Sequence, residues 1–179
     1  MVDIETLGSN SNSPIVTIAI QHFDPTGGTC APGASRYIRV KPHDDAKLDY
    51  DTIKWWLGQE DAPRREVIEA LDNGQIESSA LNELSRFIYD ICPDRRNVRL
   101  WGNGATFDNV ILDNAYKRNN ITPQWTYSGH RCFRTLVNQN PEKIVVERKG
   151  NHHCATDDVA YQLDVLREYM RINELADLK

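Results

Sequence analysis

The sequence contains no long apolar run, few cysteines and no excess of positive charge, and each shortage excludes a class of protein. No segment approaches the roughly 18 consecutive apolar residues that span a bilayer, so we expect no membrane partner. The N-terminal segment Met1–Gly8 has neither a basic nor an apolar stretch, which argues against a secretory signal and favours a cytoplasmic protein. The four cysteines form no C-x-x-C pair and are therefore expected to be reduced thiols: Cys30, Cys92, Cys132 and Cys154.

The composition is that of a single globular domain with an acidic surface. The 179 residues, 40% of them hydrophobic, are enough for one domain over 1–179 with a sizeable core. A net charge of −5 gives the molecule as a whole no attraction for nucleic acid. Nucleic-acid binding requires only a local basic patch, however, and bound metal ions can offset clustered acids. Short basic clusters lie at Arg64–Arg65, Arg95–Arg99, Lys117–Arg118, Arg131–Arg134 and Lys143–Lys149.

Hydrophobic periodicity predicts strands first and then helices alternating with a strand. An alternating segment at Pro14–Asp24, the turn-rich residues 25–35 and a strand at Ser35–Pro42 indicate a three-stranded antiparallel meander with the strand that contains Asp3. Only Met1 and Val2 precede the acidic residues of that first strand. Two residues are few for a central strand, which suggests that upstream residues are missing. The other predicted elements are helices at 49–57, 62–71, 78–91, 107–118, 131–137 and 155–175, and a strand at 97–103. This order predicts an α/β fold with a mixed central sheet flanked by helices.

Two of these helices carry specific expectations about which residues share a side. The helix at 107–118 is expected to carry Val110, Ile111, Asn114 and Ala115 on one side. The final helix is expected to bury an apolar stripe: Val159, Leu163, Leu166, Met170 and Leu175.

Acidic residues occur in three separate segments. Asp3 and Glu5 are two residues apart on a predicted strand, so both point to one face, where they repel each other unless positive charge lies between them. A solvated edge strand is the alternative. Asp108 opens a predicted helix, where it could also serve as a cap or favour the helix dipole.

The segment "NHHCATDDVAYQ", Asn151–Gln162, places two histidines ahead of two aspartates at the start of the last helix. Capping requires one aspartate and leaves the second unexplained. Asp158 and Gln162 share a face that Asp157 does not, and His153 could act as a general base. A zinc site is the alternative, with ligands from His130, Cys132 and residues 152–154, although their spacing matches no usual zinc pattern.

Three motifs in order resemble the DEDDh (DnaQ-like) branch of the DEDD 3′–5′ exonuclease superfamily. "DIETLG" matches D-x-E-T-x-G, "NGATFD" at Asn103–Asp108 matches N-x-x-x-F-D, and "HCATDD" at His153–Asp158 matches H-x-A-x-x-D. The last register selects His153 over His152 and Asp158 over Asp157. Two further segments, "WWLGQ" and "HRCFRTL", look most like phage exonuclease A, exonuclease VIII and Rv2179c-like 3′–5′ exonucleases. The resemblance implies a ribonuclease-H-like fold.

The resemblance also implies hydrolysis of 3′-terminal phosphodiester bonds with two Mg²⁺ or Mn²⁺ ions, about 3.5–4 Å apart. Hard oxygen ligands favour these ions over zinc. By family role, Asp3 bridges both ions, Glu5 and Asp158 hold the ion that carries the attacking water, and Asp108 holds the other. His153 deprotonates that water.

The implied partner is single-stranded nucleic acid or a 3′ overhang. Four residues are expected to contact the terminal nucleotide, namely Thr6, Leu7, Asn103 and Phe107, the last of which could instead be core. Arg131 and Arg134 are candidates for phosphate contact or for structural ion pairs.

Several alternatives stay open from the sequence. Trp55 and Trp56 could stack on bases or form a homodimer interface, but adjacent helical positions cannot share a face. Trp101 is expected in the core. No residue decides between DNA and RNA. A non-catalytic nucleic-acid-binding module of the same fold is the alternative function, and it would be expected to lack a carboxylate or the base.

Overall fold

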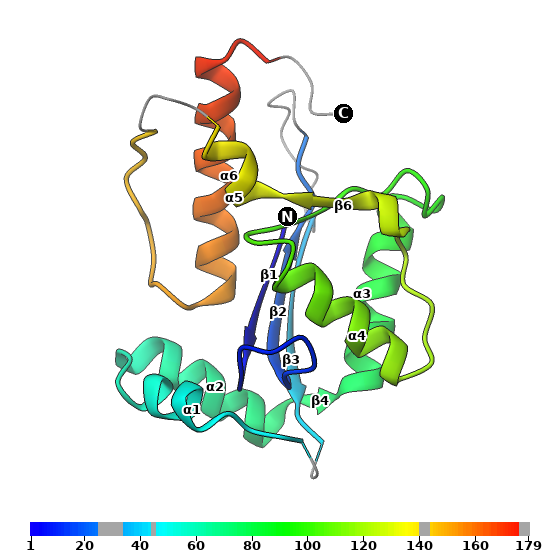
Figure 1. Cartoon of the computed structure of the whole chain (residues 1–179), viewed down its shortest axis with the longest axis vertical. Coiled ribbons are helices and arrows are strands. Elements are labelled where there is room, and N and C mark those ends of the chain that lie inside the picture. Colours follow the sequence, from blue (N-terminus) through cyan, green and yellow to red (C-terminus); the bar gives the residue numbers. More distant parts are fainter. Residues whose placement is uncertain (25–33, 44–45, 140–143, 176–179) are drawn as a thin grey trace.

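The computed structural model describes residues 1–24, 34–43, 46–139 and 144–175. Cys30, Lys143 and most of the turn expected at 25–35 lie outside these ranges. The described chain forms a mixed six-stranded sheet with helices on both faces (Figure 1). The strands are β1 (Val2–Thr6), β2 (Ile15–Gln21), β3 (Ser35–Lys41), β4 (Gln75–Ile76), β5 (Leu100–Gly102) and β6 (His130–Cys132). The helices are α1 (Tyr50–Leu57), α2 (Asp61–Asn73), α3 (Glu77–Ile91), α4 (Asp108–Arg118), the 3₁₀ turn η1 (Tyr127–Gly129), α5 (Phe133–Val137) and α6 (Ala155–Ile172).

The sheet has the order β4-β3-β2-β1-β5-β6. The expected antiparallel meander of β1, β2 and β3 is confirmed, and β5 and β6 continue the sheet in parallel with β1. β1 is thus a central strand, paired with β2 on one side and β5 on the other, and both of its acids lie within it. The helix expected at 131–137 is partly wrong, since its first residues pair with β5 as β6 and only Phe133–Val137 is helical.

The alternation of β1 gives its two faces opposite characters. Val2 and Ile4 are buried in the core that α3 and α4 share with the sheet. Asp3 and Glu5 therefore point to the other face, the one that α6 covers (Figure 1). A single short strand thus joins the larger core to an acidic site.

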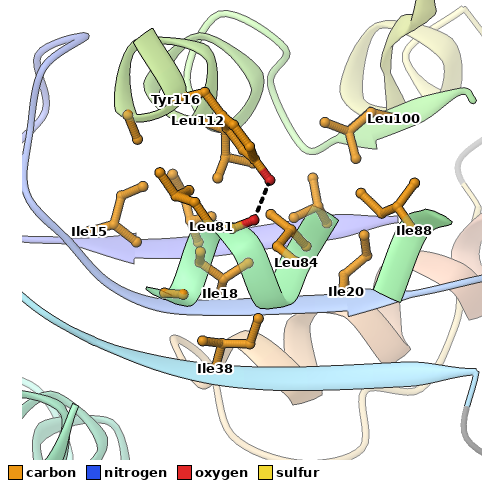
Figure 2. Packing of buried hydrophobic residues seen from close by; sticks show 14 of the residues in the cluster. Ile15, Ile18, Ile20, Ile38, Leu81, Leu84, Ile88, Leu100, Leu112 and Tyr116 are labelled. Carbon is orange, nitrogen blue, oxygen red and sulfur yellow. Dashed lines mark hydrogen bonds between the residues drawn. The ribbon is translucent and has the colours of Figure 1, made fainter. Parts of the chain in front are cut away.

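The larger core fills the space between the sheet and α3 and α4. Figure 2 shows Ile18 and Ile20 of β2 and Ile38 of β3 facing Leu84 and Ile88 of α3. Above them, the Tyr116 hydroxyl of α4 donates a hydrogen bond of 2.8 Å to the Leu81 carbonyl, which satisfies a polar group inside this apolar layer. Burial on this scale stabilises the domain by about 2 kcal/mol for each large aliphatic side chain.

Two helices differ in part from what was expected of them. The stripe of α6 is confirmed at Val159, Leu163, Leu166 and Met170, but the helix ends at Ile172 and Leu175 is 38% exposed. The helix expected at 107–118 starts at Asp108. Its fully buried residues are Asn109, Ile111, Leu112, Ala115 and Tyr116. Of the four residues expected on one side, Ile111 and Ala115 are therefore in the core, whereas Val110 and Asn114 are partly buried. The first turn of the helix packs tightly on β5.

A buried carboxylate ties the beginning of α3 to the end of α4. Glu77 is 4% exposed and forms an ion pair with Arg118. Its Oε2 also accepts hydrogen bonds from Arg118 Nε and Asn119 Nδ2, both at 2.7 Å, and lies 3.1 Å from His43 Nε2. Removing one partner of such a buried pair leaves the other charge uncompensated.

None of the helices in the described part of the chain combines the length and apolar composition of a bilayer-spanning segment.

Glu77→Gln is expected to lower the free energy of unfolding by about 3 kcal/mol, because Arg118 keeps its charge and loses its buried partner. Urea denaturation followed by circular dichroism measures this change. Asp90→Asn on the same helix is the control, since Asp90 lies 4.0 Å from Arg86 on the exposed surface. Equal unfolding midpoints for the two variants would contradict a stabilising role for Glu77.

Candidate active site

The acids of β1 meet α6 through a hydrogen bond. Gln162 Nε2 donates to Asp3 Oδ1 over 2.8 Å, and Gln162 is 2% exposed. Asp158 lies one helical turn before Gln162, so the same side of α6 carries its carboxylate towards β1. The expectation that Asp158 and Gln162 share a face is confirmed by these contacts.

Asp108 reaches the same place from the opposite side of β1. Its Oδ1 accepts a hydrogen bond of 3.3 Å from the Ile4 backbone N–H. Gly102 makes this approach possible, because a Cβ there would lie 2.3 Å from Asn109 Oδ1 and 2.9 Å from Asp108 Cβ. Asn109 Nδ2 in turn donates to the Leu100 carbonyl at 2.9 Å. A residue without a side chain at the end of β5 thus lets the first turn of α4 lie against the sheet.

His153 and Asp158 are joined by the turn that precedes α6. The His153 backbone N–H donates to Asp158 Oδ2 at 2.9 Å, and His153 has a φ of 63°. A left-handed conformation is uncommon outside glycine, and such residues occur often at functional sites. Glu5, His153 and Asp158 each offer a ligand atom within 4.8 Å of one another.

The neighbouring Asp157 has a different position. Its Oδ2 accepts a hydrogen bond of 2.8 Å from the Asn151 backbone N–H, outside the group formed by Glu5, His153 and Asp158. One aspartate of the pair therefore stabilises the turn, and the other faces β1. This division agrees with the register that the motif selected.

Burial and mutual repulsion dominate the electrostatics of the site. Burial raises the pKa of Asp3, and the charges of Asp108 and Asp158 raise it further. Burial also raises the pKa of Glu5, with the other three carboxylates adding to the effect. For Asp108, burial raises the pKa to about 7, against the lowering effect of hydrogen bonds from the Ile4, Asp108 and Asn103 backbone. Clustered carboxylates that resist ionisation indicate a site that binds positive charge.

The donor set fits hard divalent cations. Asp3, Glu5, Asp108 and Asp158 offer carboxylate oxygens, which Mg²⁺ and Mn²⁺ prefer. Gln162 Oε1 is a further buried acceptor with no hydrogen-bond donor among the described residues.

The imidazole of His153 packs against Trp55 of α1. Their ring centroids are 4.6 Å apart with the planes at 83°, an edge-to-face contact. Burial lowers the pKa of His153, although the Asp158 charge acts in the opposite direction. The ring of Trp56 packs edge-to-face against that of Trp55, with centroids 4.8 Å apart, and its Nε1 donates to the Thr6 carbonyl at 2.9 Å. The two rings therefore touch, although adjacent helical positions were expected on different faces. Trp56 is buried at 5% exposure while Trp55 is 42% exposed, so one of the pair is core as expected, and the burial of Trp101 is confirmed.

Two residues that the sequence does not assign to the site, Gln162 and Arg148, also contact its acids. The helical pattern indicates only a shared face for Gln162, and the charge pattern places Arg148 only in a basic segment. Arg148 forms an ion pair with Asp158. A sequence signal exists for Gln162, four residues after Asp158, but Arg148 lies in a segment without regular structure whose path depends on the whole fold.

The four residues expected to contact the terminal nucleotide differ in burial and in the groups that they contact. The Thr6 hydroxyl donates to the Gly8 carbonyl at 2.6 Å, and Leu7 is buried with Trp56. Phe107 packs partly against the larger core, as the core alternative expected. Asn103 is half-buried beside Asp108. The contact of these four residues with a nucleotide stays a prediction.

The two arginines expected to contact phosphate differ in their distance from the acids. Arg134 lies beside Gly104, and its charge lowers the pKa of Asp108, so it is close to the acids. Arg131 instead donates from Nη1 to the carbonyls of Ser128 and His130, both at 2.9 Å. Arg131 therefore supports the start of β6 in this structure, and its phosphate contact stays a prediction.

The zinc alternative finds little support. In the part of the chain that the structure describes, the side chains arranged to hold a metal include no cysteine. Cys132 accepts a hydrogen bond from the Thr135 hydroxyl, and His130 Nε2 lies 3.4 Å from Asp113. Cys92, Cys132 and Cys154 are free thiols, as expected.

Residues 1–170 match the family described as the 3′–5′ exoribonuclease Rv2179c-like domain. The chain belongs to this family. The expected resemblance to Rv2179c-like exonucleases is thereby confirmed, whereas the phage-type detail and the DEDDh assignment stay predictions. No curated protein is similar enough in sequence to match the chain.

A solved structure similar to this Rv2179c-like domain is the crystal structure of cell-death related nuclease 4 (CRN-4). The TM-score is 0.64 with 15% sequence identity, and the match covers 97% of this chain. The chain spans 62% of the length of that nuclease. At this identity the likeness shows the fold, which is the ribonuclease-H-like α/β fold that the motifs implied.

Asp108 is expected to lower the stability of the metal-free protein progressively as pH rises from about 4 to about 7. In this window the folded Asp108, with a pKa of about 7, keeps a proton that an unfolded aspartate with a pKa of about 3.9 releases. Asp108→Asn removes this cost. In EDTA, its melting temperature should exceed that of the wild type by roughly 10 °C at pH 8, with a smaller difference at pH 5.5.

Differential scanning calorimetry from pH 5.5 to 8.5 measures this difference. Asp164→Asn is the matched control, because Asp164 is partly exposed on α6 and pairs with Arg167 at 2.8 Å. A gap between Asp108→Asn and wild type that does not change with pH would contradict the raised pKa.

Proposed function

We propose that the protein is a metal-dependent 3′–5′ exonuclease that acts on single strands or 3′ overhangs, with RNA preferred, and releases nucleoside 5′-monophosphates. The observation that supports the proposal is the convergence of Glu5, His153 and Asp158 beside Asp3 and Asp108. The preference for RNA follows the description of the family.

The four carboxylates are proposed to hold two Mg²⁺ or Mn²⁺ ions. Asp3 is central in this arrangement, because the charges of both Asp108 and Asp158 act on it. When bound, the ions would supply Lewis-acid stabilisation of the phosphodiester charge and a more acidic water. Their charge would also offset the repulsion that raises the pKa values of Asp3 and Glu5.

His153 is proposed to accept the proton of the attacking water. Burial lowers its pKa, which favours the neutral imidazole that is able to take a proton. The contact with Trp55 restricts the ring, and the hydrogen bond from its backbone to Asp158 Oδ2 keeps it beside a carboxylate. The base is thus oriented before substrate binds, which lowers the cost of reaching the reactive geometry.

Digestion of a 5′-labelled oligonucleotide tests the proposed function. RNA and DNA of the same sequence are incubated with the protein and Mg²⁺ or Mn²⁺, with EDTA and Asp3→Asn as controls. Products should shorten stepwise from the 3′ end, faster on RNA, and disappear in both controls. Retained binding of both polymers without any product would instead favour the non-catalytic binding module.

His153→Asn is expected to lower kcat by about 10²–10⁴-fold, because it removes the proton acceptor. Asparagine tolerates a left-handed conformation, so the turn before α6 should persist. His152→Asn is the matched control, and its kcat should change by no more than about twofold, as expected for loss of a residue with no role in proton transfer. Single-turnover digestion of labelled RNA measures both variants. Equal losses would contradict the assignment of His153 as the base.

A further inference from the structure

Arg148 lies in the acidic cluster although it belongs to neither the sheet nor a helix. Its Nη2 donates to Asp158 Oδ1 and, at 3.2 Å, to the Asn151 carbonyl. The side chain is 15% exposed. Its charge also acts on Asp3 across the site, so the guanidinium partly neutralises more than one acid.

Both oxygens of Asp158 are engaged in this arrangement. Oδ1 accepts from Arg148 and Oδ2 accepts from the His153 backbone N–H. A backbone amide is neutral and leaves a lone pair free on the oxygen it contacts. A guanidinium carries a full positive charge and repels any cation that approaches the same carboxylate. Cation binding at Asp158 and the ion pair with Arg148 therefore compete.

The surroundings of Arg148 allow its guanidinium to turn without leaving the site. Its Cζ lies 4.8 Å from the centroid of the Tyr161 ring, a cation–π contact that needs no hydrogen-bond partner. Arg148 Nε is buried and has no hydrogen-bond acceptor among the described residues. A buried donor without a partner is costly, and a planar guanidinium with spare N–H groups is suited to a phosphate.

We infer that Arg148 is a movable counter-ion, which neutralises Asp158 before divalent cations are bound and then contacts the terminal phosphate of the nucleic-acid strand. This inference rests on the proposed exonuclease function and adds a phosphate-binding residue to it. Arg148 acts on two anions in turn: a carboxylate in the metal-free protein and a phosphodiester in the complex. A purely structural role, in which Arg148 only fixes the turn through Asn151, makes the opposite prediction for metal affinity.

Arg148→Met tests the inference through two measurements with opposite signs. Isothermal titration of Mn²⁺ into the metal-free protein should show about three- to tenfold tighter binding than in the wild type, because a competing charge is gone. On 5′-labelled RNA, kcat/KM should fall about 100-fold, because the phosphate loses a charged donor. Mn²⁺ should also raise the melting temperature of Arg148→Met more than that of the wild type.

Two further variants separate charge from geometry. Arg148→Lys keeps the charge, so its Mn²⁺ affinity should stay within about twofold of the wild type, and it should regain part of the activity. Lys149→Met is the matched control, since Lys149 is the exposed neighbouring cation, and both its Mn²⁺ affinity and its activity should equal those of the wild type.

The outcomes separate this inference from the proposed function. Weaker Mn²⁺ binding by Arg148→Met, or an unchanged kcat/KM in that variant while wild type and Lys149→Met degrade RNA, overturns the role of Arg148. If wild type and Lys149→Met are both inactive on RNA and DNA, the exonuclease function fails. In that case the Mn²⁺ titration still decides whether Arg148 competes with cations for Asp158.

Discussion

The repulsion among four carboxylates gathered at the middle of the sheet is the constraint around which this structure is arranged. Burying acids is costly, and here the cost falls on β1, a central strand. The strand tolerates it because its alternate residues, Val2 and Ile4, are fully buried in the larger core. The apolar packing of α3 and α4 against one face thus offsets an acidic site on the other. Without that division, the carboxylates of Asp3 and Glu5 would destabilise the sheet they belong to.

Three of the four acids receive a neutral or charged donor from another segment of the chain. Asp3 on β1 accepts from Gln162 on α6, Asp108 on α4 accepts from Ile4 on β1, and Asp158 accepts from Arg148 and from the turn before α6. These reciprocal bonds hold β1, α4 and α6 in a fixed relation. Glu5 differs, because every influence on its pKa raises it. A bound cation would therefore relieve the repulsion that acts on Glu5.

The sequence predicts those parts of the fold and site that depend on local spacing. Acids two apart on a strand share a face, and residues four apart on a helix share a side, so spacing alone pairs Asp3 with Glu5 and Asp158 with Gln162. Contacts between distant segments could not be predicted in this way. The close approach of Asn109 to Gly102 depends on how α4 lies on β5. The split of 130–137 into β6 and α5 depends on pairing with β5, which overrides the local helical pattern.

The distribution of site residues between regular and irregular structure bears on how the site works. Asp3, Glu5, Asp108 and Asp158 lie on β1 and on the first turns of α4 and α6, where backbone hydrogen bonds fix their positions. His153 and Arg148 come from the segment before α6, outside strands and helices. In the proposed reaction the acids need only stay in place, whereas His153 must take up a proton and Arg148 must change partners. The acids that must hold their positions thus lie on strands and helices, which fix side chains more precisely than loops do. The two groups whose partners change, His153 and Arg148, lie on the connecting segment.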